Sequence, residues 1–317
     1  MSMLDKLKDR IAATAAGPFA YDDYPLLKTL SYPGDAGLFS PDSATWQITA
    51  HAAIFIGGIR TLLVQAVHPE VVAGVHDHSK YREDPLGRLS RTSSYVTATA
   101  YGAMPEVEAA IARVRGAHRP VKGTSHRGET YSAGHPQLSA WVHNAMIESF
   151  AATFRAFGPR PIDDSLLDRY VAEQTRVARL LQADPLPDTW ADLESWVADH
   201  PALAPSPGMT DVVKFLRTPP FDSWPLRMAY RLMFVAAAAT IPERIRTMLG
   251  IRAVPGGLLL GRAIAGFLNW GLGTSPALRA ALRRVGANAP AYARFRRPIP
   301  EEVLGYETAE VSGSSNN

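Results

Sequence analysis

Two histidines lie in apolar, helix-forming stretches, where an imidazole could bind a metal or a cofactor. Before His118, apolar residues recur at intervals of three and four positions: Val107, Ile111 and Val114. This spacing places His118 on the inward stripe of its helix, one turn beyond Val114. His143 shares a helix face with mostly small or apolar residues that leave space beside its ring: Ala140, Asn144, Ile147 and Ala151. Each histidine has two interpretations, a core residue hydrogen-bonded to a backbone carbonyl or a ligand of a cofactor.

A second candidate combines two guanidinium groups with a hydroxyl group: Arg88, Arg91 and Thr92. On a helix, Arg88 and Thr92 lie one turn apart on one face, and Arg91 lies beside them. A guanidinium and a hydroxyl that point the same way can bind a carboxylate. The alternative is that the stem of Arg88 packs on the surface and its head pairs with Glu83 or Asp84.

Three further side chains carry weaker signals. His68 precedes Pro69, and a histidine in that position usually closes one helix or caps the next. Glu148 lies just over one helical turn beyond His143, so it is a general base if it faces the same pocket and an ion-pair partner at the surface otherwise. His200 lies in a loop and indicates no site.

The composition excludes several kinds of chemistry. The 317 residues include no cysteine, which rules out a disulfide framework, an iron–sulfur cluster, a thiolate haem ligand and a cysteine nucleophile. The 33 Lys and Arg against 30 Asp and Glu give a net charge of +3, too small a surplus to indicate nucleic-acid binding. Hydrophobic residues make up 46%, enough for a large buried core.

The apolar stretches do not have the length of a membrane span. Residues 232–241 are too few, and residues 254–272 are interrupted by Arg262 and by glycines, whereas a span needs about 20 apolar residues. We therefore expect no stable membrane insertion. The segment 258–270 is expected to form a buried helix, with a peripheral membrane contact as the alternative. Charged residues within the first ten positions leave no signal-peptide pattern, so we expect a cytoplasmic protein.

Helical periodicity dominates the chain and predicts an all-α fold of about ten helices. Helices are predicted over 43–67, 69–75, 84–100, 105–119, 136–157, 161–182, 189–199, 226–239, 242–249, 256–272 and 276–285. Residues 123–134 are predicted to form a loop, and the proline-rich residues 201–225 a linker or a wrapped loop. We expect a single compact domain over residues 1–300 and a flexible tail over 301–317.

Four ordered segments together resemble the family of the rubber oxygenase (latex clearing protein) catalytic domain, which also includes the ER-bound oxygenase of mycophenolic acid biosynthesis. They are Arg60–Pro69, Tyr81–Thr92, Val114–Gly123, and Tyr131–Ala133 followed by Trp141–His143 and Glu148–Ser149. The resemblance covers about residues 40–285.

This resemblance implies a helical fold that encloses a haem pocket for haem b. His118 then falls at the position of the proximal iron ligand, and Arg88, Arg91 and Thr92 fall on an element close to the haem. His143 could be a distal ligand, a catalytic base or a pocket residue. The family's lysine that can occupy the distal iron position is replaced by Arg91, and a guanidinium that never deprotonates is a poor ligand.

The function expected from these residues is that of a haem-b-dependent oxygenase or oxidase. The implied substrates are an apolar small molecule and dioxygen or peroxide, and the implied iron ligand is a histidine. A histidine ligand excludes thiolate-driven monooxygenation. The alternative is a non-catalytic helical protein that binds haem or another hydrophobic ligand.

Overall fold

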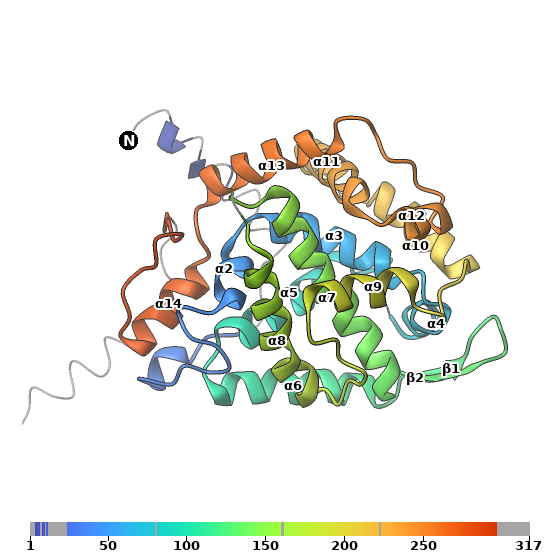
Figure 1. The fold of residues 1–317 in the computed structure, drawn as a ribbon, viewed down its shortest axis with the longest axis horizontal. Helices are drawn as coiled ribbons and strands as arrows, with labels where there is room; N and C mark the ends of the chain where they lie inside the picture. The colour runs from blue at the N-terminus through green and yellow to red at the C-terminus, as the bar shows by residue number, and fades with distance from the viewer. Residues whose placement is uncertain are drawn as a thin grey trace, which may run out of the picture. The chain divides into compact units, whose positions relative to one another are not determined.

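The computed structural model describes residues 4–6, 8, 9, 11, 24–79, 81–159, 162–221 and 223–296. These residues are predominantly helical (Figure 1), so the prediction of an all-α fold is confirmed. The helices are η2 (Thr29–Ser31), α2 (Ala44–Ala50), α3 (Ala53–Gln65), α4 (Pro69–His78), α5 (Pro85–Tyr101), α6 (Met104–His118), α7 (Pro136–Phe157), α8 (Asp164–Leu180), α9 (Trp190–Asp199), α10 (Pro207–Arg217), α11 (Trp224–Thr240), α12 (Glu243–Met248), α13 (Gly257–Leu272) and α14 (Pro276–Val285).

Proline and capping side chains set the beginnings of many of these helices. Pro136 is the first residue of α7. A backbone N–H at this position would have no partner within the helix, so the helix loses no hydrogen bond to proline. The carboxylate of Asp84 accepts a hydrogen bond from the backbone N–H of Gly87 at 2.9 Å and caps α5. Ser206 caps α10 in the same way, through the N–H of Met209 at 3.0 Å. These local signals explain why most helix starts could be located in the sequence.

Contacts divide the chain into two compact units built from interleaved segments. Unit 1 comprises Met1–Ala50, Asp84–Val114 and Leu268–Asn317, and unit 2 comprises His51–Glu83 and Arg115–Phe267. The expectation of a single domain over 1–300 stays a prediction. The proposed tail, 301–317, lies outside the described residues.

Unit 1 is organised around a buried arginine on α14. Arg284 donates hydrogen bonds to the carbonyl oxygen of Asp35 at 2.6 Å and to that of Tyr101 at 2.7 Å, so it joins α14 to the end of α5. Trp46 on α2 donates from its indole nitrogen to the carbonyl oxygen of Ala100 at 2.7 Å. The described part of this unit therefore holds α2, α5 and α14 together by buried polar bonds as well as by apolar packing.

Unit 2 is built around α7, which packs against α3, α8, α9 and α11. The approach of α3 to α7 is close at Gly57, where an added Cβ atom would lie 2.8 Å from the hydroxyl of Thr153 and 2.9 Å from the ring of Phe150. Glycine is the residue that fits at this crossing. A two-stranded antiparallel sheet, β1 (Lys122–Thr124) and β2 (Thr130–Ser132), pairs Lys122 with Ser132 beside α4.

Three predicted segments differ from the structure. The helix expected over 43–67 is two helices that are separated at His51 and Ala52. The loop expected over 123–134 contains the β1–β2 hairpin, whose strands of three residues are too short to show alternation, and Gly128 supplies the positive φ of +80° at its turn. The expected linker 201–225 contains α10, because Pro207 starts this helix and does not interrupt a chain segment.

The apolar helix α13 is the largest departure from expectation. It was predicted to be buried, yet Leu258, Leu259 and Phe267 are 47%, 70% and 51% exposed. Its buried positions are Gly257, Gly261, Ala265, Gly271 and Leu272, so all but the last are small residues. By length and composition, none of the described helices could cross a membrane alone, and only α2 with α3 passes as a bent pair.

Candidate functional site

His143 lies in the middle of α7 and is almost completely buried, with 2% of its surface exposed. Neither ring nitrogen closes a hydrogen bond with any part of the chain that the structure describes. Burial lowers the pKa of His143 to about 4, and the backbone of Gln174 on α8 opposes this shift only in part. The imidazole is therefore neutral at pH 7, and apart from this approach of the Gln174 backbone its nitrogens have no partner among the described residues.

Small side chains surround this part of α7. Ala140, one turn before His143, forms a buried cluster with Ala178 and Ala183, and Leu186 and Trp196 pack against it. The next residue after the histidine, Asn144, donates to the carbonyl oxygen of Pro185 at 3.1 Å, and its own amide oxygen is buried without a partner. The expected face of small and apolar residues around His143 is thus present, and it is directed toward α8 and the segment that follows it.

His118 is the last residue of α6 and is half-buried. The expected inward stripe is present: Val107 and Ile111 are buried, and Val114 is half-buried. The carbonyl oxygen of His118 accepts a hydrogen bond from the N–H of Val121 at 3.1 Å. One turn earlier, the guanidinium of Arg115 donates to the side chain of Gln182 at 3.2 Å. The last turn of α6 therefore lies near the chain that follows α8, the helix whose Gln174 faces His143.

The element Arg88, Arg91 and Thr92 lies on α5 in unit 1. Arg88 is half-buried, whereas the Arg91 side chain is 66% exposed and pairs with Asp84 at 3.2 Å. The hydroxyl of Thr92 donates to the carbonyl oxygen of Arg88 at 3.0 Å. Asp84, one of the two partners considered for Arg88, is therefore paired with Arg91, and the hydroxyl of Thr92 is engaged with its own helix.

One turn beyond Thr92, Tyr95 places its hydroxyl in the interior of unit 1. That hydroxyl is buried and has no hydrogen-bond partner among the described residues. Burial raises the pKa of Tyr95 well above its usual range, so the group stays protonated and can donate. The sequence analysis did not identify Tyr95, although its position on the Arg88 and Thr92 face was available as a signal.

Glu148 has a structural role that excludes it as a free base. It forms a buried two-point ion pair with Arg60 on α3, and both side chains are 1% exposed. Arg60 also donates to the hydroxyl of Ser149 at 2.8 Å and to the carbonyl oxygen of Thr240 at 3.2 Å. Glu148 therefore joins α7 to α3 in the interior, and not at the surface as the sequence alternative had it.

A cluster of aromatic rings and histidines packs beside α7, and the sequence analysis missed it. His200 lies 4.7 Å from Trp196, 5.0 Å from Trp141 and 5.6 Å from His68, measured between ring centroids. Burial lowers the pKa of His68 to about 4 despite Glu70, whose carboxylate lies 3.2 Å from its ring. His68 is therefore neutral and packed against aromatic rings, and its side chain does not cap α4.

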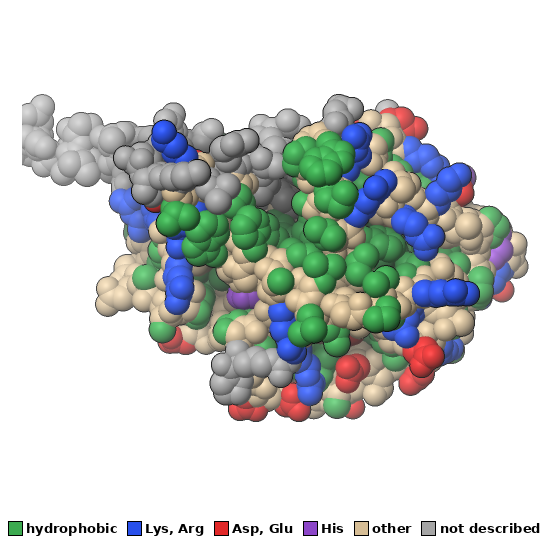
Figure 2. Space-filling view, turned by 90° about the horizontal axis from the view of Figure 1, so that it is seen from above, with side chains coloured by type: hydrophobic (Ala, Val, Ile, Leu, Met, Phe, Trp, Pro, Cys, Tyr) green, Lys and Arg blue, Asp and Glu red, His purple; other side chains and the backbone are tan. Residues whose placement is uncertain are grey.

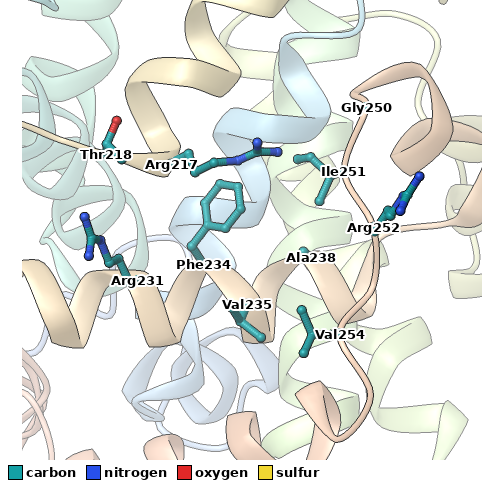
Figure 3. A pocket seen from close by; sticks show the side chains of 10 residues that line it. All are labelled: Arg217, Thr218, Arg231, Phe234, Val235, Ala238, Gly250, Ile251, Arg252 and Val254. Carbon is teal, nitrogen blue, oxygen red and sulfur yellow. The ribbon is translucent and has the colours of Figure 1, made fainter.

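A pocket of about 560 Å³ lies in unit 2, apart from these sequence candidates (Figure 3). Its apolar floor is formed by Phe234, Val235, Ala238, Ile251 and Val254. Three arginines also line it: Arg217, Arg231 and Arg252. Among the residues that the structure describes, none of the three forms an ion pair. The pocket thus combines apolar surface with free positive charge.

Comparison with known protein families identifies the chain. The family model described as "ER-bound oxygenase mpaB/B'/Rubber oxygenase, catalytic domain" matches residues 46–270, which include α7, the end of α6 and most of α13. No curated protein and no solved structure matches the chain. The matched family is one of oxygenases, oxidoreductases that use dioxygen together with a second substrate. Because the match covers well over half of the residues, the chain belongs to the mpaB and rubber oxygenase catalytic-domain family.

Proposed function

We propose that this protein is a haem-b-dependent oxygenase that acts on an apolar small molecule, with its iron held by a histidine. The observation that carries the proposal is His143, a buried and neutral imidazole whose two nitrogens close no hydrogen bond of ordinary geometry in the described chain. Family membership supplies the oxygenase chemistry, and the side chains supply the reason to place the cofactor near α7.

The unpartnered ring is suited to a cofactor pocket for an energetic reason. Leaving one buried polar atom without a hydrogen bond costs about 1 to 3 kcal/mol. A ligand that accepts from or coordinates the imidazole removes that cost, and coordination requires the neutral form, which burial already favours. The residues present therefore fit a group that is bound through an imidazole.

We assign the roles of the side chains as follows. His118, at the end of the inward stripe of α6, would hold the iron, and His143 would hold a proton or a substrate atom at its ring. Arg88 would bind a propionate, with Arg91 and Thr92 on the same element. Haem b, when bound, supplies an iron centre that activates dioxygen or peroxide. Ala140, Ala178 and Ala183 form a buried apolar wall on this side of α7, which would exclude water from the bound group.

The first experiment is an absorption spectrum of the purified protein, before and after titration with hemin. We expect a Soret band at a stoichiometry of one, and a response of this band to dioxygen or peroxide. A protein that stays colourless and takes up no hemin would overturn the proposal. It would leave a non-catalytic protein that binds a hydrophobic ligand.

Three variants assign the ligand. His118→Ala should abolish stoichiometric hemin binding, and His143→Ala should weaken it or alter the spectrum less. His126→Ala is the matched control, because His126 is an exposed loop histidine. If the His118 variant kept the wild-type band while the His143 variant lost it, the two roles would be reversed. Arg88→Ala should weaken hemin binding by about one to two decades, since a charge-assisted bond contributes roughly 1.5 to 3 kcal/mol.

A further inference from the structure

Helix α13 contacts the protein through several glycines, while three of its large apolar side chains are exposed. Gly257 packs on α11, where an added Cβ atom would lie 2.8 Å from that of Ala239, and Gly261 lies directly against the ring of Phe157. The large apolar side chains point away from these contacts: Leu258, Leu259 and Phe267. A helix that only completed the core would bury these three side chains, as α13 buries Leu272 at its end.

Three further large apolar side chains are exposed just before α13 and on α11, the helix that Gly257 contacts. Val254, just before α13, is 51% exposed, and Leu232 and Trp224 on α11 are 38% and 64% exposed. Figure 2, which views the side occupied by α11 and α13 at the top of Figure 1, shows hydrophobic side chains gathered on this face with Lys and Arg side chains beside them. We call the six exposed apolar residues the α11–α13 face: Trp224, Leu232, Val254, Leu258, Leu259 and Phe267.

Positive charge accompanies this apolar surface. Val254 belongs both to the face and to the wall of the arginine-lined pocket, where Arg217, Arg231 and Arg252 stand around an apolar floor (Figure 3). All three arginines are exposed. An apolar surface next to unpaired cations complements a lipid bilayer, whose acyl chains are apolar and whose headgroup layer can carry negative charge.

We infer that the α11–α13 face docks on an anionic phospholipid membrane. The apolar side chains enter the boundary between headgroups and acyl chains, and the three pocket arginines bind lipid phosphates. A second copy of the chain fits this face less well, because a two-fold contact would bring the same arginines together. The inference concerns peripheral docking and is independent of the proposed haem chemistry.

The test is co-sedimentation of the full chain with two kinds of vesicle at physiological salt, phosphatidylcholine alone and phosphatidylcholine with about one-third phosphatidylglycerol. We expect pelleting with the anionic vesicles and little with the neutral ones. Added salt should reduce the pelleting, because it screens the arginines. Absence of pelleting with anionic vesicles, or equal pelleting with both kinds, would overturn the inference.

Two double variants separate the contributions of the face. Leu259→Asp with Phe267→Asp removes the apolar contact, and Arg231→Glu with Arg252→Glu reverses charge at the pocket. Each should lower the partition coefficient by roughly tenfold or more. Binding strength rises with the apolar area that enters the membrane, and each basic residue near an anionic surface adds to the binding free energy. The matched charge control is Arg169→Glu with Arg179→Glu, because both arginines are exposed on α8, and it should leave binding near the wild-type value.

Folding and self-association are measured on the same variants. All should keep the wild-type circular dichroism spectrum and melting temperature, because every substituted residue is exposed. Light scattering after size exclusion reports the oligomeric state. A wild-type dimer that Leu259→Asp with Phe267→Asp converts to a monomer would show that a second copy covers the face and would overturn membrane docking.

Discussion

Helices α7 and α13 depart from the usual pattern of burial in opposite directions. α7 buries the charged Glu148 and the polar His143, while α13 exposes Leu259 and Phe267. Glu148 finds its partner, Arg60, within the chain. The ring of His143 closes no hydrogen bond of ordinary geometry among the described residues, and the outer face of α13 is exposed. A buried polar side chain has a structural role where the chain itself supplies its partner. Where the chain supplies no partner for a buried polar group or an exposed apolar one, the comparison indicates a partner outside the protein.

The largest expected effect comes from the buried ion pair between Arg60 and Glu148. Arg60→Ala leaves the carboxylate of Glu148 buried and unpaired, and removal of one partner of a buried ion pair costs about 3 to 5 kcal/mol. Urea unfolding should show this loss in the free energy of unfolding. The double variant Arg60→Met with Glu148→Leu should recover most of it, because no charge is then buried. A loss below about 1 kcal/mol for the single variant would contradict the structural role of this pair.

Acid should destabilise the protein through its buried histidines. The pKa of His143 falls from 6.5 in the unfolded chain to about 4 in the fold, because burial disfavours the charged ring. The unfolded chain therefore binds the proton more readily, and stability is lost as the pH falls from about 6.5 to about 4. For a single histidine, this difference corresponds to at most about 3 kcal/mol. His51 and His68 act in the same direction.

The variant His143→Gln separates this contribution from the others. It removes one of these titrations, so the free energy of unfolding should fall less steeply between pH 6.5 and 4 than in the wild type. Chemical denaturation at several pH values measures the slope. His126→Gln is the control and should leave the slope unchanged, because His126 is exposed. An equal slope in the His143 and His126 variants would show that the His143 ring is not desolvated in solution.

Two glycines of α13 test the orientation of that helix. Gly261 lies against the ring of Phe157, whereas an added Cβ atom at Gly266 would have no neighbour within 4 Å. Gly261→Ala should therefore destabilise the protein by about 1 to 3 kcal/mol through overpacking. Gly266→Ala should stabilise it by about 0.5 to 1 kcal/mol, because alanine favours the helix. Melting temperatures that shift in the same direction for both variants would contradict the observed orientation of α13.

The sequence predicted most of the fold because its local signals are strong. Proline at the first helical position and apolar periodicity located α7 and α14 at their observed bounds. The hairpin at Lys122–Ser132 was missed because three-residue strands show no alternation. The exposure of α13 was missed because hydropathy records which residues are apolar but not which face a tertiary contact covers.

The candidate site was predictable only in part. The face around His143 follows from helical spacing, and the structure shows it buried. The pairing of Glu148 with Arg60, and the packing of His200 against Trp141, join residues far apart in the sequence, and no local pattern encodes such contacts. The assignment of iron to His118 rests on the family motif and stays a prediction.

The smallest effect is expected at Arg91, and its small size makes it informative. Its pair with Asp84 is largely exposed, and such pairs contribute about 0 to 1 kcal/mol, so Arg91→Lys should barely change the melting temperature. Asp84→Ala should cost about 1 kcal/mol, because it also removes the cap of α5. Hemin-loaded Arg91→Lys should acquire a six-coordinate low-spin spectrum at alkaline pH if residue 91 approaches the iron, since lysine can lose its proton and arginine cannot. With stability unchanged, a new spectrum would report contact with the cofactor and not unfolding, and an unchanged spectrum would place Arg91 away from the iron.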